Sequence, residues 1–509
     1  MQKTSFNMYQ ALRAAFPGDL EQIAVETDDA QFYTWRDLER GSAMLANYLQ
    51  SLDLPPEARI AVQVEKSVEA LMLYLATLRA GYVFLPLNTA YQSAEMAYFI
   101  GNAEPSVVVC TSSNFGWVSK LAFQADTPWV FTLDDDRSGS LLNRAASASD
   151  RHPVVFRDAG DVAVIIYTSG TTGRSKGAML THGNMFSNAR VLHDLWGWRS
   201  AAEGGDVLIH ALPIFHVHGL FVAIHGALIN GSKMIWCARF EPGFVIQKMA
   251  EATVFMGVPT LYVRLLAEPA LTRQAASHMR LFISGSAPLL QDTFKAWQER
   301  TGHTILERYG MSETVMLTSN PYLGERCGGT VGPALPGVEL RVVDDRGRKL
   351  AAGDIGGIEV KGPNVFAGYW RMPEKTAEDF TADGFFRTGD VGQIDADGYL
   401  SIVGRSKDLI ISGGFNVYPA EIESFINDLP GVAESAVIGL PDPDLGEVGV
   451  AVVVPRAGAS LDPGAVLAAL NATLAHYKVP KQCHVVADLP RNSMGKVQKN
   501  LLRTQYRQN

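Results

Sequence analysis

The sequence has few cysteines and lacks the segments that would direct it to a membrane or to a nucleic acid. Its four cysteines lie far apart and form no CxxC pair, which argues against a disulfide framework and a zinc site. No apolar run approaches the ~20 residues of a membrane-spanning helix. No run of Lys and Arg suggests binding to nucleic acid or to an anionic membrane. We therefore expect a cytoplasmic protein with neither of these partners.

The amino-terminal segment also lacks the features of a secretory signal. Residues 1–20 contain no continuous apolar core and no small-residue cleavage site. Lys3, Arg13 and the lack of acidic residues before Asp19 give only a weak resemblance to a transit peptide. We expect a plain amphipathic helix at this end of the chain.

The remaining composition is that of a large globular protein. Apolar residues make up 47% and charged residues 19% of 509 residues, and the formal net charge is -9. This length exceeds what one hydrophobic core usually organises, so more than one domain is expected. A binding site for an anionic ligand must then be a local positive pocket on a mildly acidic protein.

Short β-rich runs alternate with helical patterns along most of the chain. Residues 58–65 and 106–110 have strand character, and residues 67–80 repeat their apolar residues at helical spacing. Residues 162–167 are almost continuously apolar, as in a strand that is buried on both faces. This alternation predicts an α/β fold with largely parallel sheets and helical crossovers.

Two later changes in the pattern predict the domain organisation. Short strands separated by turns between 338 and 360 predict an antiparallel β subdomain. The polar segment at Arg405–Asp408 precedes a compact α+β set. We therefore expect a large N-terminal domain over 1–404 and a small C-terminal domain over 405–509.

One segment rich in glycine and hydroxyl groups carries the strongest chemical signal. Residues 167–177 read YTSGTTGRSKG and follow the predicted buried strand. Glycine lets the backbone approach a ligand closely, and hydroxyls, N–H groups, Arg174 and Lys176 can bind phosphate oxygens. The spacing differs from GxxxxGK[ST], which excludes a P-loop. The alternative interpretation is a Ser/Thr/Gly-rich surface loop.

The segment resembles the signature of the acyl-adenylate-forming superfamily, which includes acyl-CoA synthetases, peptide-synthetase adenylation domains and luciferases. Other segments with the same resemblance follow in order: SGSAPL at 284–289, ERYGMSE at 307–313, TGD at 388–390, GRSKD at 404–408 and PRNSMGK at 490–496. The resemblance covers essentially the whole chain. It implies an AMP-binding N-terminal domain and a small, mobile C-terminal domain.

The resemblance implies an enzyme that activates a carboxylic acid with ATP and Mg2+ and passes the acyl group to coenzyme A. The positions that match the phosphate-binding loop are Thr168, Ser169, Gly170, Thr171, Thr172, Gly173 and Lys176. Glu313 and Thr168 match the magnesium ligands, and Asp390 and Arg405 match the positions near the ribose. The positions on the adenine side are Ser286, Ala287, Pro288, Glu307, Arg308, Tyr309, Gly310, Met311 and Ser312.

Lys496 matches the catalytic lysine of adenylate formation, and Lys176 and Glu313 complete the expected catalytic set. A lysine is a compact charge on a flexible stem, so it can reach oxygens on which negative charge develops. Lys407 occupies the hinge position, where many members carry aspartate, so this sequence departs from them there. Acetylation of Lys496 by a lysine acetyltransferase would remove its charge.

The acid pocket is expected between residues 213–220, residues 257–265 and Ser284–Ala287. Arg264 lies in an apolar helical stretch, and a buried arginine requires an anionic partner. A second carboxylate on the substrate would supply that partner, which indicates malonate or methylmalonate. Arg280 is the alternative arginine, and Arg264 could instead extend to the surface.

Other residues of this pocket and the longer stretches around it refine the expectation. His216, His218 and Ser284 are expected to line the pocket, since two histidines alone are a weak metal motif. Stretches such as ALPIFHVHGLFVA and DLPRNSMGKVQKN most closely resemble malonyl-CoA synthetases, ligases of fatty acid metabolism. The alternatives are a CoA ligase for another short acid, a stand-alone adenylation enzyme, and a nucleotide-binding protein without catalysis.

Overall fold

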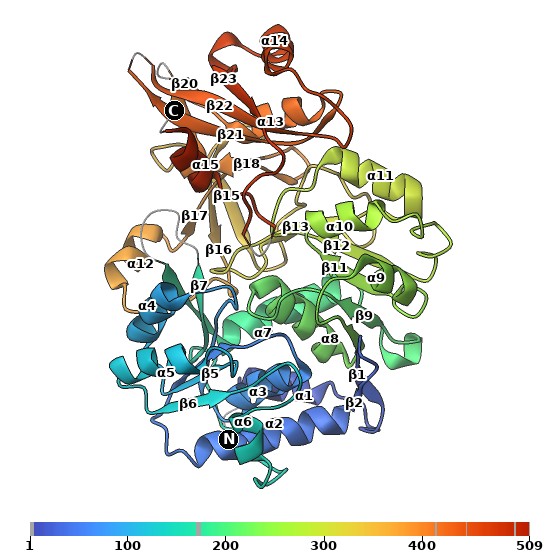
Figure 1. Cartoon of the computed structure of the whole chain (residues 1–509), viewed down its shortest axis with the longest axis vertical. Coiled ribbons are helices and arrows are strands. Elements are labelled where there is room, and N and C mark those ends of the chain that lie inside the picture. Colours follow the sequence, from blue (N-terminus) through green and yellow to red (C-terminus); the bar gives the residue numbers. More distant parts are fainter. Residues whose placement is uncertain (1–4, 169–174, 413–414, 444, 493–494, 508–509) are drawn as a thin grey trace. The chain divides into compact units, whose positions relative to one another are not determined.

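The computed structural model describes residues 5–168, 175–412, 415–443, 445–492 and 495–507. By its internal contacts the chain divides into two compact units. The N-terminal unit comprises Met1–Glu339 and Lys361–Gly384, and the C-terminal unit comprises Leu340–Val360 and Phe385–Asn509. Figure 1 follows the chain through both units from blue to red.

A six-stranded sheet carries the phosphate-binding segment. Its order is β6 (Trp129–Thr132), β5 (Val107–Cys110), β3 (Arg59–Gln63), β4 (Val83–Pro86), β7 (Val162–Thr168) and β8 (Lys176–Thr181). The strands from β6 to β7 are parallel, and β8 returns antiparallel beside β7. Every residue of β5 is buried, which explains its run of valines.

An eight-stranded sheet forms the second half of the N-terminal unit. Its order is β14 (Thr318–Ser319), β13 (Leu306–Tyr309), β12 (Leu281–Ser284), β11 (Val254–Gly257), β9 (Val207–His210), β10 (Lys233–Trp236), β1 (Ile23–Thr27) and β2 (Phe32–Thr34). The pairs from β1 to β13 are parallel, and both edge strands are antiparallel. The carboxyl ends of the inner strands therefore meet along one edge of the sheet.

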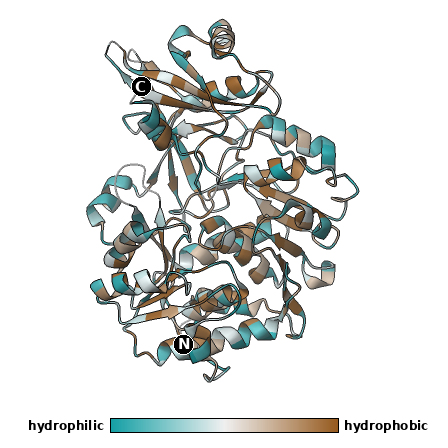
Figure 2. Ribbon diagram, viewed as in Figure 1, coloured by the Kyte–Doolittle hydropathy of each residue, from teal (hydrophilic) through white to brown (hydrophobic). Residues whose placement is uncertain are grey.

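Helices connect and cover these strands. They are α1 (Met8–Ala14), α2 (Trp35–Gln50), α3 (Val68–Arg79), α4 (Ser93–Ala103), α5 (Phe115–Gln124), α6 (Ser140–Ala145), α7 (His182–Leu195), α8 (His225–Asn230), α9 (Pro242–Lys248), α10 (Pro259–Leu266), α11 (Gln291–Thr301) and α12 (Pro373–Asp379), with short helices η1 (Ala201–Glu203) and η2 (His218–Ile224). Helix α3 is buried on every face, and the Ser67 hydroxyl caps its start by accepting from the Ala70 amide. Figure 2 shows the contrast with α11, whose outer face is hydrophilic.

The C-terminal unit contains two further sheets. An antiparallel sheet has the order β15 (Glu339–Val343), β16 (Gly356–Lys361), β17 (Phe386–Ile394) and β18 (Leu400–Arg405). The other sheet has the order β20 (Phe415–Val417), β19 (Ile410–Ser412), β22 (Gly446–Pro455) and β21 (Val432–Asp442), with β23 (Gln482–Val485) beside β22. The helices are η3 (Ser406–Asp408), α13 (Pro419–Asn427), α14 (Pro463–Thr473), η4 (His476–Lys478) and α15 (Lys499–Tyr506).

The predicted α/β fold class is confirmed, with two largely parallel sheets, an antiparallel β sheet and a small α+β part. The predicted strand at 162–167 is β7, and the predicted helix at 67–80 is α3. The contact-defined units place most of β15 to β18 with the C-terminal residues, whereas the sequence prediction placed residues up to 404 in the N-terminal domain. The boundary at Arg405 and the hinge at Lys407 stay predictions.

Candidate active site

The phosphate-binding segment spans the turn from β7 to β8. Residues 169–174 lie outside the described part of the chain, and with them the predicted positions Ser169, Gly170, Thr171, Thr172 and Gly173. Thr168 and Lys176, on either side, pair across the two strands. The Tyr98 hydroxyl donates to the Ser175 carbonyl at 2.7 Å, and the Trp370 amide donates to the Gly177 carbonyl at 2.7 Å. The part of the segment that leads into β8 is therefore held by two hydrogen bonds, one from Tyr98 and one from Trp370.

Lys176 meets a group of polar side chains that sequence reasoning did not select. Its ammonium lies 3.5 Å from a carboxylate oxygen of Asp379 and 4.3 Å from the centre of the Tyr369 ring. The Tyr369 hydroxyl donates to Glu313 at 3.2 Å. Burial, followed by the carboxylates of Glu313 and Asp379, raises the pKa of Tyr369 well above its ordinary value. The predicted residues Lys176 and Glu313 are thus brought together through Tyr369.

The two motifs expected on the adenine side follow adjacent strands. Ser284, at the end of β12, pairs with Glu307 of β13, so residues 284–288 and 307–312 meet at the carboxyl ends of parallel strands. The Gly329 amide donates to Glu307 Oε1 at 3.1 Å. Burial raises the pKa of this carboxyl to about 7. A Cβ atom at Gly310 would lie 1.9 Å from the Val315 carbonyl oxygen, so only glycine fits there.

Arg308 differs from its neighbours in the same motif. Successive side chains of a strand point to opposite faces, and Arg308 lies against Gly285, where an added Cβ would be 2.4 Å from Nη1. The residue is 3% exposed, and its Nε and Nη2 atoms have no hydrogen-bond partner in the described part of the chain. Burial lowers its pKa to about 9. A guanidinium is therefore buried here with no acidic side chain of the described residues paired to it.

His218 lies near this guanidinium, and Ser284, which pairs with Glu307 on the neighbouring strand, adds another buried polar atom. His218 opens η2, a π-helical turn of a kind often found at functional sites. Its Nδ1 lies 3.3 Å from the Ser286 hydroxyl, whereas Nε2 is buried and, among the described residues, has no partner. The Ser284 hydroxyl is also buried without a partner there. Burial, and then the nearby Arg308 charge, lowers the pKa of His218 well below its ordinary value.

The contact between Ser286 and His218 has the composition of a nucleophile–base pair, but its electrostatics argue against that role. A serine nucleophile needs a histidine that can accept a proton and become positively charged. The Arg308 charge opposes this, and no carboxylate contacts His218 in the described structure. Ser286, at φ 72°, is held in the left-handed region. The pair therefore lacks the electrostatics that a serine nucleophile and its base require.

The structure corrects two expectations about arginine. Arg264 was expected to be buried, but it lies on the exposed side of α10 with its guanidinium 5.2 Å from the centre of the Phe240 ring. Arg280 precedes β12 at the end opposite Ser284, and its guanidinium donates to buried Asp206 at 2.8 and 2.6 Å. That pair neutralises Arg280 within the protein. His216 is half-buried, and its Nδ1 accepts from the His218 amide at 3.2 Å.

In the C-terminal unit, Asp390 and Arg405 pair across β17 and β18. Arg405 Nε lies 3.0 Å from Asp390 Oδ1, which brings together the two residues expected near the ribose. Lys496 lies near both residues: burial and the charge of Arg405 lower its pKa to about 8, against the opposing effect of Asp390. Lys407 also has its pKa lowered to about 8 by burial.

A tight turn presents Lys496. The Lys496 amide donates to the Asn492 side chain at 2.9 Å, and the Asn492 amide donates to the Lys496 carbonyl at 2.9 Å. Arg491 and Val497 form a β-bridge across this turn. Hydrogen bonds therefore join the described residues on either side of 493–494.

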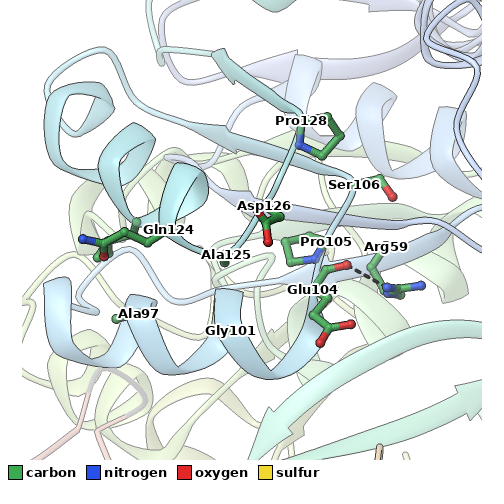
Figure 3. Close-up of a pocket in the computed structure, with 11 residues that line it drawn as sticks. Arg59, Ala97, Gly101, Glu104, Pro105, Ser106, Gln124, Ala125, Asp126 and Pro128 are labelled. Atoms are coloured by element: carbon green, nitrogen blue, oxygen red, sulfur yellow. Dashed lines mark hydrogen bonds between the residues drawn. The ribbon is translucent and has the colours of Figure 1, made fainter.

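A separate cavity lies elsewhere in the N-terminal unit. It has a volume of about 670 Å3 and is lined by Arg59, Glu104 and Asp126, among others (Figure 3). Arg59 begins β3, so the cavity lies at the amino ends of the parallel strands. Ligands of such sheets bind at the opposite, carboxyl ends. Arg59 also already donates to the carbonyls of Ala103 and Glu104, at 2.9 and 2.7 Å.

The described residues lack the features of a membrane span and of an all-protein metal cluster. No helix among them is long and apolar enough to cross a membrane. They contain no group of three or more His, Cys, Asp or Glu side chains that could hold a metal ion. A magnesium ion would therefore need ligands from its substrate in addition to Glu313, which is how this ion usually binds.

Comparisons with known proteins agree with this architecture. Residues 12–370 match the AMP-binding enzyme family, and residues 421–496 match the AMP-binding enzyme C-terminal domain. A malonate–CoA ligase of Arabidopsis thaliana is 36% identical over 480 residues, covering 88% of this chain and 78% of the relative. A feruloyl-CoA synthase of Amycolatopsis sp is 36% identical over 483 residues, covering 93% of this chain and 94% of the relative. The structure of ATP-bound MatB from Rhodopseudomonas palustris matches with a TM-score of 0.96 and 53% identity over 99% of each chain. The chain belongs to the AMP-binding enzymes of the acyl-adenylate-forming superfamily and is an ATP-dependent, AMP-forming acid–CoA ligase.

Proposed function

We propose that this enzyme makes malonyl-CoA, and methylmalonyl-CoA from the branched diacid, using ATP and coenzyme A. The first step forms an acyl-adenylate and pyrophosphate, and the second forms the thioester and AMP. The names of relatives support malonate, but a relative of equal identity is named for feruloyl-CoA. The choice between acids therefore rests on the chemistry of the pocket.

The observation that carries the proposal is the buried guanidinium of Arg308, for which the described part of the chain offers no carboxylate partner. An uncompensated buried cation is costly, and a substrate carboxylate that pairs with it removes that cost. The buried Nε2 of His218 and the hydroxyl of Ser284 are available to complete the hydrogen bonds of a polar ligand. A plain fatty acid would leave all these groups unsatisfied. A short diacid can use one carboxylate for the adenylate and the other for this site.

Arg264 is a second candidate for the distal carboxylate. It is exposed, and no acidic side chain of the described chain pairs with it. An exposed guanidinium is solvated, so its pairing with a carboxylate gains less than pairing at a buried site. We therefore propose Arg308 as the principal partner and Arg264 as an outer contact.

The residues on the phosphate side fit MgATP. Glu313 offers a buried hard oxygen ligand, and Lys176 offers a positive charge a short distance away through Tyr369. A bound Mg2+ would neutralise charge on the phosphate oxygens during displacement. Thr168 and Lys176 of this chain hold the ends of the segment that we propose to cradle the β- and γ-phosphates.

The C-terminal unit supplies the remaining groups that we propose for catalysis. Lys496 stabilises charge on the oxygens between acyl group and α-phosphate, and Asp390 accepts hydrogen bonds from the ribose. Lys407 acts as the hinge between the two half-reactions. Replacing Lys407 by proline would fix its φ angle, so thioester formation should slow while pyrophosphate release persists. Loss of pyrophosphate release with normal thioester formation would remove the hinge assignment.

Lys496 is also a proposed site of control by a lysine acetyltransferase. Acetylation would remove its positive charge, and adenylate formation should stop in proportion to the acetylated fraction. Mass spectrometry of the modified enzyme beside its pyrophosphate-release activity would test this. Full activity of stoichiometrically acetylated protein would exclude it.

A panel of acids tests the proposed substrate. Malonate, methylmalonate, succinate, acetate, butyrate and ferulate would be compared by pyrophosphate release and by the CoA thioester formed. We expect kcat/KM for malonate to exceed that for butyrate by about 10²-fold or more, the scale of one buried charge pair. Preference for a monoacid would overturn the diacid proposal. Pyrophosphate release without thioester would indicate a stand-alone adenylation enzyme.

A further inference from the structure

A chain of contacts connects the strand ends of both sheets in the N-terminal unit to the turn that carries His218. The Nε2 atom of His210, the last residue of β9, lies 3.0 Å from the Gly219 carbonyl oxygen, in the first turn of η2. The Lys66 ammonium donates to the His210 carbonyl at 2.8 Å and to the Cys237 carbonyl at 2.6 Å. Lys66 follows β3 of the six-stranded sheet, whereas His210 belongs to the eight-stranded sheet. The contacts therefore join the two sheets next to the turn that carries His218.

Packing fixes these side chains in place. The His210 ring stacks on Trp236 with 5.0 Å between ring centres and an angle of 18° between the rings. The Lys66 ammonium lies 4.7 Å from the centre of the same indole. His210 is 1% exposed. The described contacts of both side chains are with backbone carbonyls and with Trp236.

Burial determines what His210 can donate, and it also lowers the pKa of the neighbouring Lys66 to about 7. Burial, and then the Lys66 charge, lowers the pKa of His210 well below its ordinary value, so the imidazole is neutral. A neutral imidazole has one N–H, and a carbonyl can only accept. The hydrogen on His210 therefore resides on Nε2 and is donated to Gly219.

The Gly219 carbonyl belongs to a turn with little freedom to adjust. A Cβ atom at 219 would lie 2.0 Å from the Pro213 carbonyl oxygen, so the backbone is closely packed there. A π-helical turn is a rare geometry that other contacts must maintain. His218, immediately before Gly219, has a buried Nε2 without a partner among the described residues and lies near the Arg308 charge.

We propose that Lys66 and His210 are positioning residues that hold the His218 turn in the geometry needed to bind the acid. This inference rests on the proposed acid site. A misplacement of about 1 Å in such a group is enough to reduce activity by about 10²-fold. The two residues therefore set acid recognition without touching the acid, and they leave the nucleotide side unchanged.

Two substitutions of His210 separate the hydrogen bond from the packing. His210→Phe keeps a ring on Trp236 but removes the donor, whereas His210→Gln keeps an N–H donor without the ring. We expect His210→Phe to raise KM for malonate roughly tenfold, with KM for ATP changed less than about twofold, and to reduce the preference for malonate over butyrate. His210→Gln should recover most of the wild-type KM for malonate. Lys66→Gln keeps a hydrogen-bond donor without the charge. Its KM for malonate should lie between the values of the two His210 variants.

The outcomes distinguish this inference from the proposed function. Thermal unfolding would be measured for each variant, and the Gln variants carry the test if His210→Phe does not fold. A wild-type KM for malonate in His210→Phe, or an equal rise of KM for malonate and ATP, would overturn the positioning role. If instead the wild-type enzyme does not prefer malonate to butyrate, the proposed function fails. The same variants assayed with the preferred acid would then still test the positioning role.

Discussion

The phosphate side and the acid side of the N-terminal unit handle their polar groups in opposite ways. On the phosphate side the protein pairs its own charges: Lys176 lies beside Asp379, and Glu313 accepts from Tyr369. On the acid side, Arg308, His218 and Ser284 keep buried atoms that no described residue satisfies. When the triphosphate binds, Lys176 must therefore exchange its protein partner for a phosphate oxygen. When a polar acid binds, it supplies hydrogen-bond partners that the described side chains lack. The first exchange gains modest net free energy, and the second gains much more.

The largest expected effect comes from removing the Lys496 charge, which should slow adenylate formation without preventing substrate binding. Lys496→Ala should reduce adenylate formation by about 10³-fold or more, the scale for removing a preorganised charge from a transition state. Thioester formation from supplied malonyl-adenylate should be largely retained. ATP and malonate should still bind, as measured by calorimetry, since their other proposed contacts remain in place.

Lys481→Ala is the matched control for this variant. Lys481 is an exposed lysine of the same unit, and its backbone amide pairs with the Gly449 carbonyl. Both half-reactions should be unchanged in this variant. An equal loss of both half-reactions in Lys496→Ala would contradict the assigned role.

The next largest effect comes from removing the Arg308 charge. This change should lower the preference for malonate but raise the stability of the ligand-free protein. Arg308→Met should lower the preference for malonate over butyrate by about 10²-fold or more, since breaking a buried charge pair costs about 3–5 kcal/mol. The same change removes an unpaired buried cation, so the free energy of unfolding without ligand should rise by about 1–4 kcal/mol. Chemical denaturation and the acid panel would measure the two quantities.

Arg280→Met is the contrasting variant. Arg280 already has Asp206 as a buried partner, so its removal leaves a carboxylate unpaired. We expect the free energy of unfolding to fall by about 3–5 kcal/mol while the preference for malonate is kept. If Arg308→Met also destabilised the ligand-free protein, the guanidinium would have a structural partner and the acid-side assignment would fail.

The rate of adenylate formation should depend on pH through Lys496. Its pKa is lowered to about 8 by burial and by Arg405, and catalysis needs its protonated form. The value of kcat/KM for ATP should therefore fall as pH rises through about 8, approaching tenfold per pH unit. Lys496→Arg retains charge at high pH, so it should shift this decline to higher pH even if its rate is lower.

Lys407 provides the check on that assignment, because its pKa is also lowered to about 8. A decline in kcat/KM that persists in Lys496→Arg and disappears in Lys407→Arg would assign the titration to the hinge residue. A profile without any decline up to pH 9, about one unit above the lowered value, would contradict the role of both lysines.

The local sequence was sufficient to predict the fold. It was also sufficient to predict those site residues whose position follows directly from their motif. The buried strand β7 and helix α3 follow from the apolar pattern, and Glu313 and Lys176 lie in the motifs by which they were predicted. Arg308 was predicted to lie on the adenine side because the residues beside it in the motif, Glu307 and Tyr309, were predicted to lie there. The alternation of strand side chains places it on the opposite face from Glu307 and Tyr309, and that rule applied to the sequence would have separated them.

Other parts of the site depend on contacts that no local pattern encodes. Arg280 is neutralised by Asp206, which precedes it by 74 positions. Tyr369 reaches Glu313 because its backbone bridges to Ala178 beside the phosphate segment. Arg264 has the apolar surroundings of a buried residue in sequence, but the rotation of α10 exposes it. The partners and the burial of these side chains are properties of packing.

The smallest expected effect probes the partner exchange on the phosphate side. Asp379→Asn removes the carboxylate that lies 3.5 Å from the Lys176 ammonium, so the triphosphate no longer competes for that lysine. Both side chains are partly exposed, at 20 and 23%, which limits the gain to about 0.2–1 kcal/mol. KM for ATP, and the inhibition constant for pyrophosphate, should fall by about 1.5- to fivefold.

Glu378→Gln is the control for this variant because Glu378 is the neighbouring acid on α12 and pairs with Lys375. It should leave KM for ATP unchanged. A rise of KM for ATP in Asp379→Asn would show that the carboxylate orients Lys176 for the triphosphate, and the phosphate side would then resemble the acid side in needing a supporting contact. A fall confined to Asp379→Asn would instead keep the two sides distinct, since only the phosphate side would bind its substrate better after losing a protein partner.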